Sequence, residues 1–184
     1  MVGAVRLIPY AAEHVVAIQS YLDDPAVRAF TPVPEPVPEH HPQVYLTRFD
    51  TGRADGTSTA WAILDDDGSV LGFACAPHLS KATGDIELGY SVGPDARRRG
   101  VATWVLRELT GWAFGWGAER IELRISADNA GSRRVAERCG YTVEGTLRSA
   151  YLKVGRRVDT TVWSRLPSDP KVVEDEGSGA YVQG

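Results

Sequence analysis

The chain has 184 residues, 43% of them hydrophobic, and a formal net charge of −4. This length fits one domain with a full core, and the acidic balance excludes a protein that binds nucleic acid through its overall charge. The two cysteines, Cys75 and Cys139, form neither a disulfide framework nor a zinc motif. The sequence has no run of about 18 apolar residues to cross a membrane and no apolar core of a signal peptide. We therefore expect a cytoplasmic protein without a membrane or nucleic-acid partner.

The first part of the chain alternates short strands with helices. Val15, Ile18 and Leu22 recur on one face of a 3.6-residue period, which predicts a helix. Five prolines between 31 and 42 exclude regular structure there, so this stretch is either a surface loop or a wall of a substrate site. In chain order we predict a strand at 5–8, helices at 11–22 and 24–30, this loop at 31–42 and a third helix at 43–53. A two-stranded hairpin follows, with strands at 59–64 and 70–77. No cluster of potential ligands has the spacing of a metal site, so no metal is expected.

The most informative stretch is 86–116. Alternation along IELGYSV predicts a strand at 85–92, and a one-sided apolar stripe predicts a helix at 101–116. The turn between them is the basic sequence GPDARRRG. A helix start carries N–H groups without intrahelical partners and the positive end of the helix dipole. We therefore predict a phosphate-bearing ligand at 97–103, with a solvated basic turn as the alternative.

The remainder is predicted to form a strand at 120–126 and a helix that Asp128 or Asn129 caps and that ends near Arg138. Three further strands are expected at 141–146, 150–154 and 158–166. Residues 1–167 then form one domain, and 168–184 form a disordered tail. The element order predicts a mixed α/β (α+β) sheet with one central βαβ segment, not a doubly wound one.

Two common phosphate-binding motifs are absent from the basic turn, namely the dinucleotide-binding G-x-G-x-x-G and the P-loop. Instead, Arg97-x-x-Gly100-x-Ala102 after IELGYSV resembles the acyl-coenzyme A signature of the GCN5-related N-acetyltransferases (GNAT family). Asn129-x-x-Ser132, followed by G-Y-x-x-E-G-x-x-R ending at Arg148, resembles the RimJ/RimL branch of that family. The resemblance covers roughly 5–166.

This resemblance implies a GNAT fold, a mostly antiparallel, splayed sheet with helices on both faces and acetyl-coenzyme A wedged between two central strands. It implies an N-acyltransferase that moves an acetyl group to a primary amine by direct attack. The acceptor would be a protein N-terminus, a lysine or a small-molecule amine. Glu35, Glu39, Asp85 and Glu87 suit a cationic acceptor, which 26–42 and 148–151 would recognise.

The resemblance also assigns roles to individual residues. Glu87 is the candidate base, acting through a water, and Asp85 on the same strand face would raise its pKa. The Val92 N–H would stabilise negative charge on the thioester carbonyl oxygen. Many family members have a tyrosine acid at the position of Ala136, so that role is excluded here. Ser132, one helical turn after Asn129, resembles the serine that this branch places near the coenzyme sulfur. The implied cofactor-binding residues are Ser91, Val92, Arg97, Arg98, Arg99, Gly100, Val101, Ala102, Thr103, Asn129 and Ser132.

Several alternatives stay open on the sequence alone. Glu87 could be a structural carboxylate or bind the substrate amine, and Asn129 could be a simple helix cap. The protein could be a non-catalytic coenzyme-A-binding module, or it could use another donor such as succinyl-coenzyme A. A homodimer is also left open.

Overall fold

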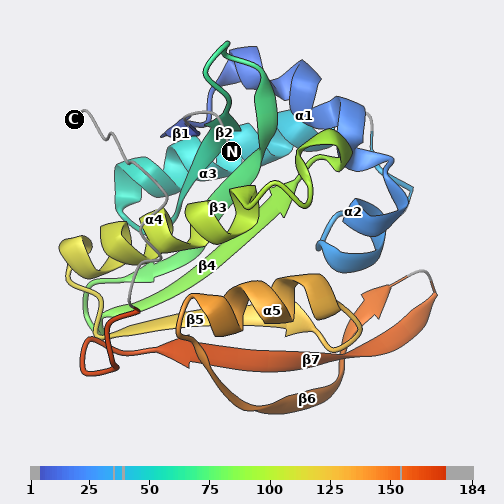
Figure 1. Cartoon of the computed structure of the whole chain (residues 1–184). Helices are drawn as coiled ribbons and strands as arrows, with labels where there is room; N and C mark the ends of the chain where they lie inside the picture. The colour runs from blue at the N-terminus through green and yellow to red at the C-terminus, as the bar shows by residue number, and fades with distance from the viewer. Residues whose placement is uncertain (1–4, 35, 39, 154, 173–184) are drawn as a thin grey trace.

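The computed structural model describes residues 5–34, 36–38, 40–153 and 155–172. Within these ranges the chain forms five α-helices, two short 3-10 turns and seven strands (Figure 1). The helices and 3-10 turns are η1 (Ala12–His14), α1 (Val15–Leu22), α2 (Pro25–Phe30), α3 (His41–Asp55), η2 (Pro94–Ala96), α4 (Val101–Trp116) and α5 (Ala130–Arg138). The strands are β1 (Arg6–Pro9), β2 (Thr59–Leu64), β3 (Val70–Ser80), β4 (Asp85–Val92), β5 (Arg120–Ser126), β6 (Thr142–Lys153) and β7 (Arg156–Arg165).

The strands make one sheet in the order β1-β2-β3-β4-β5-β7-β6. Every neighbouring pair is antiparallel except β4 and β5, which α4 connects as parallel strands. This single crossover is the central βαβ segment that the sequence predicts. The mixed, mostly antiparallel sheet with helices confirms the predicted fold class.

Two hydrophobic clusters lie on opposite faces of the sheet, because successive strand side chains alternate between the faces. Ile86 and Leu88 of β4 pack with Val105 and Leu109 of α4 in the larger cluster. The smaller cluster joins α1, α2 and α3 to the other face, where Phe73 and Cys75 of β3 border it. Helices therefore cover both faces, as expected.

The two parallel strands pair for a short distance only and then diverge (Figure 1). Their register runs from Asp85 opposite Arg120 to Glu87 opposite Glu122 and ends there. On its other side, β4 stays paired with β3 as far as Val92. The second half of β4 therefore has one hydrogen-bonded edge and one open edge, which is the splay that the resemblance implies.

The structure corrects several predicted boundaries, most clearly those of the third helix and of the strands after Tyr141. The helix expected at 43–53 begins at His41, because Pro42 fits the first turn of a helix. It ends at Asp55, because the next residue, Gly56, has a left-handed φ of 69°. The strands expected at 141–146 and 150–154 are the single strand β6, which passes an irregularity at Ser149 with φ 54°.

Most of the expected tail, 173–184, lies outside the described residues, as do Glu35 and Glu39. No helix in the described ranges is long and apolar enough to cross a membrane.

Candidate functional site

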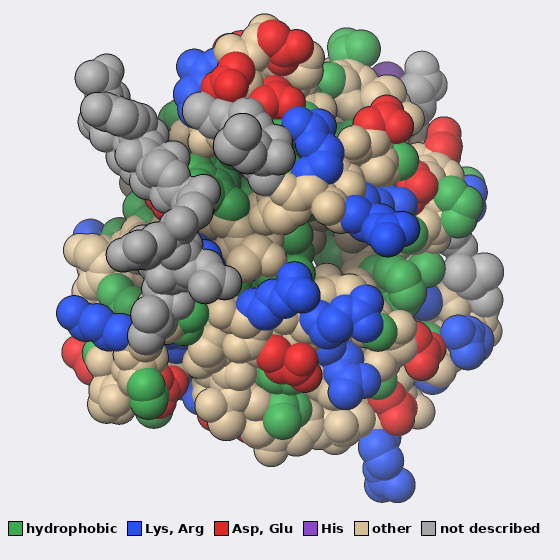
Figure 2. Space-filling model, viewed as in Figure 1, with side chains coloured by type: hydrophobic (Ala, Val, Ile, Leu, Met, Phe, Trp, Pro, Cys, Tyr) green, Lys and Arg blue, Asp and Glu red, His purple; other side chains and the backbone are tan. Residues whose placement is uncertain are grey.

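A cavity of about 870 Å³ opens where β4 and β5 diverge. Figure 2 shows a hollow in this face with Lys and Arg side chains on either side of it. The wall contains Glu87 and every predicted coenzyme-binding residue except Arg99. The structure thus brings together residues that lie more than 40 positions apart in the sequence.

The open edge of β4 presents main-chain groups to this cavity. The Gly93 N–H donates to the Leu71 carbonyl at 2.8 Å, and this bond shows which residues of β4 are hydrogen-bonded to β3. In an antiparallel pair, alternate residues turn their N–H and C=O groups toward the partner strand. Val92 and Tyr90 therefore point these groups away from β3, and the Val92 carbonyl accepts from Arg97 Nε at 3.2 Å. Ser91 turns its main chain toward β3, so Tyr90 is the additional residue that sequence reasoning missed.

The turn after β4 folds into a concave main-chain surface. Arg98 and Gly100 have left-handed φ values of 60° and 84°. Alternating left- and right-handed residues turn successive N–H groups to one side, which makes an anion-binding nest. Helix α4 starts immediately afterwards at Val101, and no side chain of the described residues caps it. Its first N–H groups are therefore available to a ligand that lies in the cavity.

The three arginines of the turn have different partners. Arg97 forms an ion pair with Asp24, which also caps α2, and this contact lowers the pKa of Asp24. Arg99 points to the β2–β3 turn and pairs with Asp65 at 3.0 Å. Arg98 remains in the cavity wall. Three guanidinium groups were predicted to bind the coenzyme. That of Arg97 is paired with Asp24, and that of Arg99 lies away from the cavity, which leaves Arg98.

Helix α5 forms the opposite wall of the coenzyme side. The Asn129 side chain accepts from the Ser132 N–H at 3.0 Å, so it does cap this helix. Ser132, Arg134 and Arg138 follow along the cavity wall. The two arginines were not predicted, although their i, i+4 spacing places them on one face of the helix and could have indicated it.

The hydroxyl of Tyr90 is buried beside Ser132. It has no hydrogen-bond partner within 3.5 Å among the described residues. Burial raises the pKa of Tyr90 to about 12, and the neighbouring Ser132 hydroxyl acts against that rise. The Tyr90 hydroxyl is therefore protonated at neutral pH and can donate a hydrogen bond.

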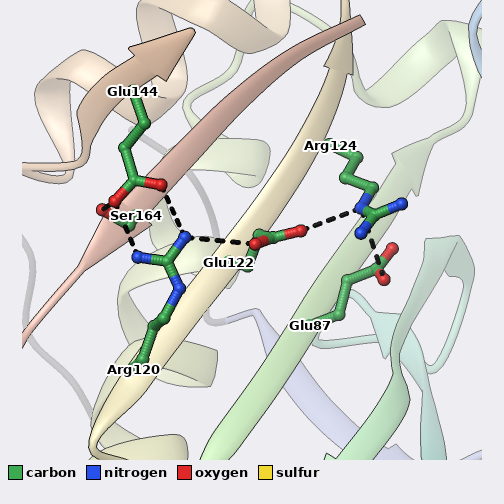
Figure 3. Close-up of polar contacts among 6 residues, drawn as sticks. All are labelled: Glu87, Arg120, Glu122, Arg124, Glu144 and Ser164. Atoms are coloured by element: carbon green, nitrogen blue, oxygen red, sulfur yellow. Dashed lines mark hydrogen bonds and ion pairs between the residues drawn. The ribbon is translucent and has the colours of Figure 1, made fainter. Parts of the chain in front are cut away.

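Glu87 lies at the point where the β4–β5 pairing stops, and its side chain points toward Arg124 (Figure 3). Since Ile86 and Leu88 on either side of it pack with α4, Glu87 lies on the opposite face of the sheet, where α1 and α3 pack. Burial raises the pKa of Glu87, and the nearby Arg124 opposes the rise. The like charge that raises the pKa is Glu122, directly opposite on β5, and not the predicted Asp85. Strand pairing, which the sequence could not specify, brings Glu122 closer. The remaining charges that act on the Glu87 carboxyl are His78 of β3 and Arg48 of α3.

Arg124 belongs to a chain of ion pairs that crosses the sheet (Figure 3). Its Nε lies 2.8 Å from Glu122 and 3.9 Å from Glu87. Arg120 then bridges Glu122 at 3.1 Å and Glu144 of β6 at 2.6 Å. Glu144 also accepts from Ser164 at 2.7 Å, and these contacts lower its pKa to about 2. Arg124 is thus held mainly by Glu122, and its contact with Glu87 is longer and weaker.

The two cysteines are unsuited to nucleophilic chemistry. Burial raises the pKa of Cys139 to about 11 and that of Cys75 to about 12, so both stay protonated thiols. No group of three His, Cys, Asp or Glu side chains in the described ranges is arranged to hold a metal ion.

Comparisons with known proteins agree with this geometry. Residues 4–142 match the model of an acetyltransferase (GNAT) domain. L-amino acid N-acetyltransferase AaaT of Escherichia coli (strain K12) is 32% identical over 81 residues, which are 44% of this chain and 50% of that protein. The chain spans about half the length of the curated relatives it matches.

Two solved structures share the fold over most of the chain. Mycobacterium smegmatis RimJ with CoA-disulfide has a TM-score of 0.82 at 20% identity, over 90% of this chain and 83% of that one. Spermidine N-acetyltransferase from Vibrio cholerae, with CoA and spermine, has a TM-score of 0.79 at 16% identity, over 90% and 96%. Since the domain model covers most of the chain, and the splayed sheet and the turn occur together, the chain belongs to the GNAT acetyltransferase family.

Proposed function

We propose that this protein transfers an acetyl group from acetyl-coenzyme A to the nitrogen of a primary amine. One observation carries the proposal: the open edge of β4 faces the same cavity as the uncapped start of α4 and the Glu87 carboxyl. Main-chain N–H groups, an uncapped helix start and a carboxyl group therefore surround one space, which supports the proposal. Each of these groups meets a different part of the reaction.

The coenzyme side fits a pyrophosphate attached to a slender arm. The left-handed residues Arg98 and Gly100 and the first N–H groups of α4 would hold the phosphates. Arg98, Arg134 and Arg138 add positive charge around them. The open edge of β4 would accept the arm as an extra strand, through the main-chain groups of Tyr90 and Val92. Asn129 retains its side-chain N–H₂, because only its oxygen is used for capping.

The acceptor side fits the activation of an amine. When bound, acetyl-coenzyme A supplies a thioester whose C–S bond breaks as the C–N bond to the amine forms. Glu87 accepts the proton that the amine loses, directly or through one water, and its raised pKa makes it a better base than a free carboxylate. The Val92 N–H donates to the carbonyl oxygen as negative charge develops there. Ser132, with the Tyr90 hydroxyl beside it, donates a hydrogen bond to the departing thiolate, which then takes a proton from solvent.

The proposal is tested on the purified protein in two measurements. Isothermal titration calorimetry should show binding of acetyl-coenzyme A, and release of free thiol should depend on an added amine. The amines are an apolar amino acid, spermidine and a peptide with a free N-terminus. Binding without thiol release for any amine would indicate a non-catalytic coenzyme-A-binding module. Faster thiol release from succinyl-coenzyme A than from acetyl-coenzyme A would identify succinyl-coenzyme A as the donor instead.

A further inference from the structure

The half of the cavity on the α1–α3 face of the sheet, here called the acceptor chamber, has a specific charge pattern. The Glu87 carboxyl lies on this face of the sheet, opposite the face that packs on α4, so an amine that meets Glu87 would occupy this half. The chamber is defined by the side chains of Tyr10, Phe30, Val33, Tyr45, Arg48, Phe73, Glu87, Arg124, Tyr151 and Lys153. These residues come from α2, α3, β3, β4, β5 and β6 and from the segments beside α1 and α2.

The chamber carries more positive than negative charge. Among the described lining residues of the whole cavity, Glu87 is the one carboxylate. Arg48, Arg124 and Lys153 face it from three different elements. Asp85, expected on the acceptor side from the sequence, is not among the lining residues. A polyamine would bring several ammonium groups to a chamber with these cations and a single carboxylate, which electrostatic complementarity disfavours.

The three cations differ in how far their own contacts satisfy them. Arg124 donates to Glu122 at 2.8 Å, and Lys153 donates to the Val33 carbonyl at 2.9 Å. Arg48 lies over the Phe49 ring, 5.5 Å from its centroid, and none of the carboxylates in the described ranges forms an ion pair with it. Arg48 lines the same cavity as Glu87 and Tyr45, and its positive charge acts to lower the pKa of both groups. A guanidinium in this position suits a carboxylate, which it can bind in a bidentate manner.

The rest of the chamber wall is aromatic. The Phe73 ring is the centre of a cluster with Tyr10, Tyr45 and Phe49, at centroid distances of 5.2, 6.3 and 5.8 Å. Phe30 and Tyr151 add rings from α2 and β6, and both are partly exposed. Such a wall gains free energy by covering an apolar or aromatic side chain of a ligand.

We propose that the acceptor is a free apolar α-amino acid, whose amine meets Glu87, whose carboxylate binds Arg48 and whose side chain packs on the Phe73 cluster. This inference rests on the proposed function and narrows it to one substrate class. It disfavours polyamines, and it disfavours peptide N-termini because the α-carboxyl group of a peptide's first residue is part of the peptide bond.

The test compares two acceptors that differ by one group, L-phenylalanine and phenethylamine, in the thiol-release assay with acetyl-coenzyme A. We expect kcat/KM to be at least about 30-fold higher for L-phenylalanine, since a charge-assisted bidentate contact typically contributes one to two factors of ten. In Arg48→Gln this ratio should fall toward one, mainly through a higher KM for the amino acid. Any difference in basicity between the two amines cancels when the ratios of the variant and the parent are compared.

Arg53→Gln is the matched control. It removes the same charge from the same helix, but Arg53 pairs with Asp50 and does not line the cavity. It should leave the ratio unchanged. The inference is overturned if phenethylamine, spermidine or a peptide is acetylated as well as L-phenylalanine, or if Arg48→Gln slows both paired acceptors equally. Those results leave the acetyltransferase function intact, whereas failure of every amine to release thiol overturns both.

Discussion

The two halves of the cavity are built in different ways. The coenzyme half comes from two continuous segments, 90–103 and 129–138, and it offers mainly main-chain N–H groups. The acceptor chamber is assembled from side chains of six elements, spread from Tyr10 to Lys153. Main-chain groups depend on conformation, so a short motif with a glycine at the right place is enough to encode them. A chamber of side chains depends on the whole fold and can change its ligand through single substitutions.

The contrast is tested most strongly at Glu87, where the two halves meet. Glu87→Gln removes the base but keeps the shape, so kcat should fall about 10²–10⁴-fold. The affinity for acetyl-coenzyme A should stay within about twofold, because no coenzyme contact is proposed for this side chain. Steady-state kinetics and calorimetry measure the two effects separately. A matching loss of coenzyme affinity would show that the halves are not independent.

The next effect is expected at Gly100, on the coenzyme half. Gly100→Glu puts a side chain at φ 84° and a carboxylate beside the phosphates, so coenzyme binding should weaken roughly 100-fold. Gly115→Glu is the control, since a Cβ at Gly115 meets nothing within 4 Å. Calorimetry on both variants decides the point, with the melting temperature as a check of folding. Equal loss in both variants would remove the nest from coenzyme binding.

A smaller effect is expected on the pH dependence. Glu87 must be deprotonated to act, so activity falls as the pH drops through its raised pKa. Glu122→Gln removes a like charge and releases Arg124 toward Glu87, and both changes lower that pKa. The acidic limb of the kcat/KM profile should therefore move to lower pH.

Glu144→Gln is the companion variant, because it removes the same charge at the far end of the ion-pair chain. The acidic limb of its kcat/KM profile should stay close to that of the parent protein. Identical limbs for the parent and Glu122→Gln would mean that another group limits the rate at low pH.

The smallest effects distinguish two neighbouring arginines. Arg98 lines the cavity and Arg99 pairs with Asp65. Arg98→Gln should weaken coenzyme binding about 3–10-fold, the size of one charge-assisted contact, and Arg99→Gln less than twofold. Calorimetry at low salt gives the larger difference, because salt screens such contacts. The reverse order would place the coenzyme phosphates on the Asp65 side of the turn.

The sequence predicted the elements of the site better than their partners. Local periodicity and turn chemistry located β4, α4 and α5 almost to the residue, since these signals are short-range. Strand order and register are long-range properties, so Glu122 could not be identified as the neighbour of Glu87. The same limit explains why Arg99 was grouped with Arg98, although its partner Asp65 lies in another hairpin. The role of Arg48 was likewise not predicted, because nothing near it in the sequence resembles a site.

The short contact between β4 and β5 has a consequence for amide exchange along β4. Ser91 and Gly93 give their N–H groups to β3, whereas Tyr90 and Val92 turn theirs to an edge that has no strand beside it. Exchange with deuterated solvent should thus alternate from fast to slow, residue by residue, at the end of this strand. A bound coenzyme arm would fill the missing place in the sheet, and the alternation would give way to uniform protection. The substrate would then act as an eighth strand, joining two parts of the sheet that the protein alone connects through three residues on each side.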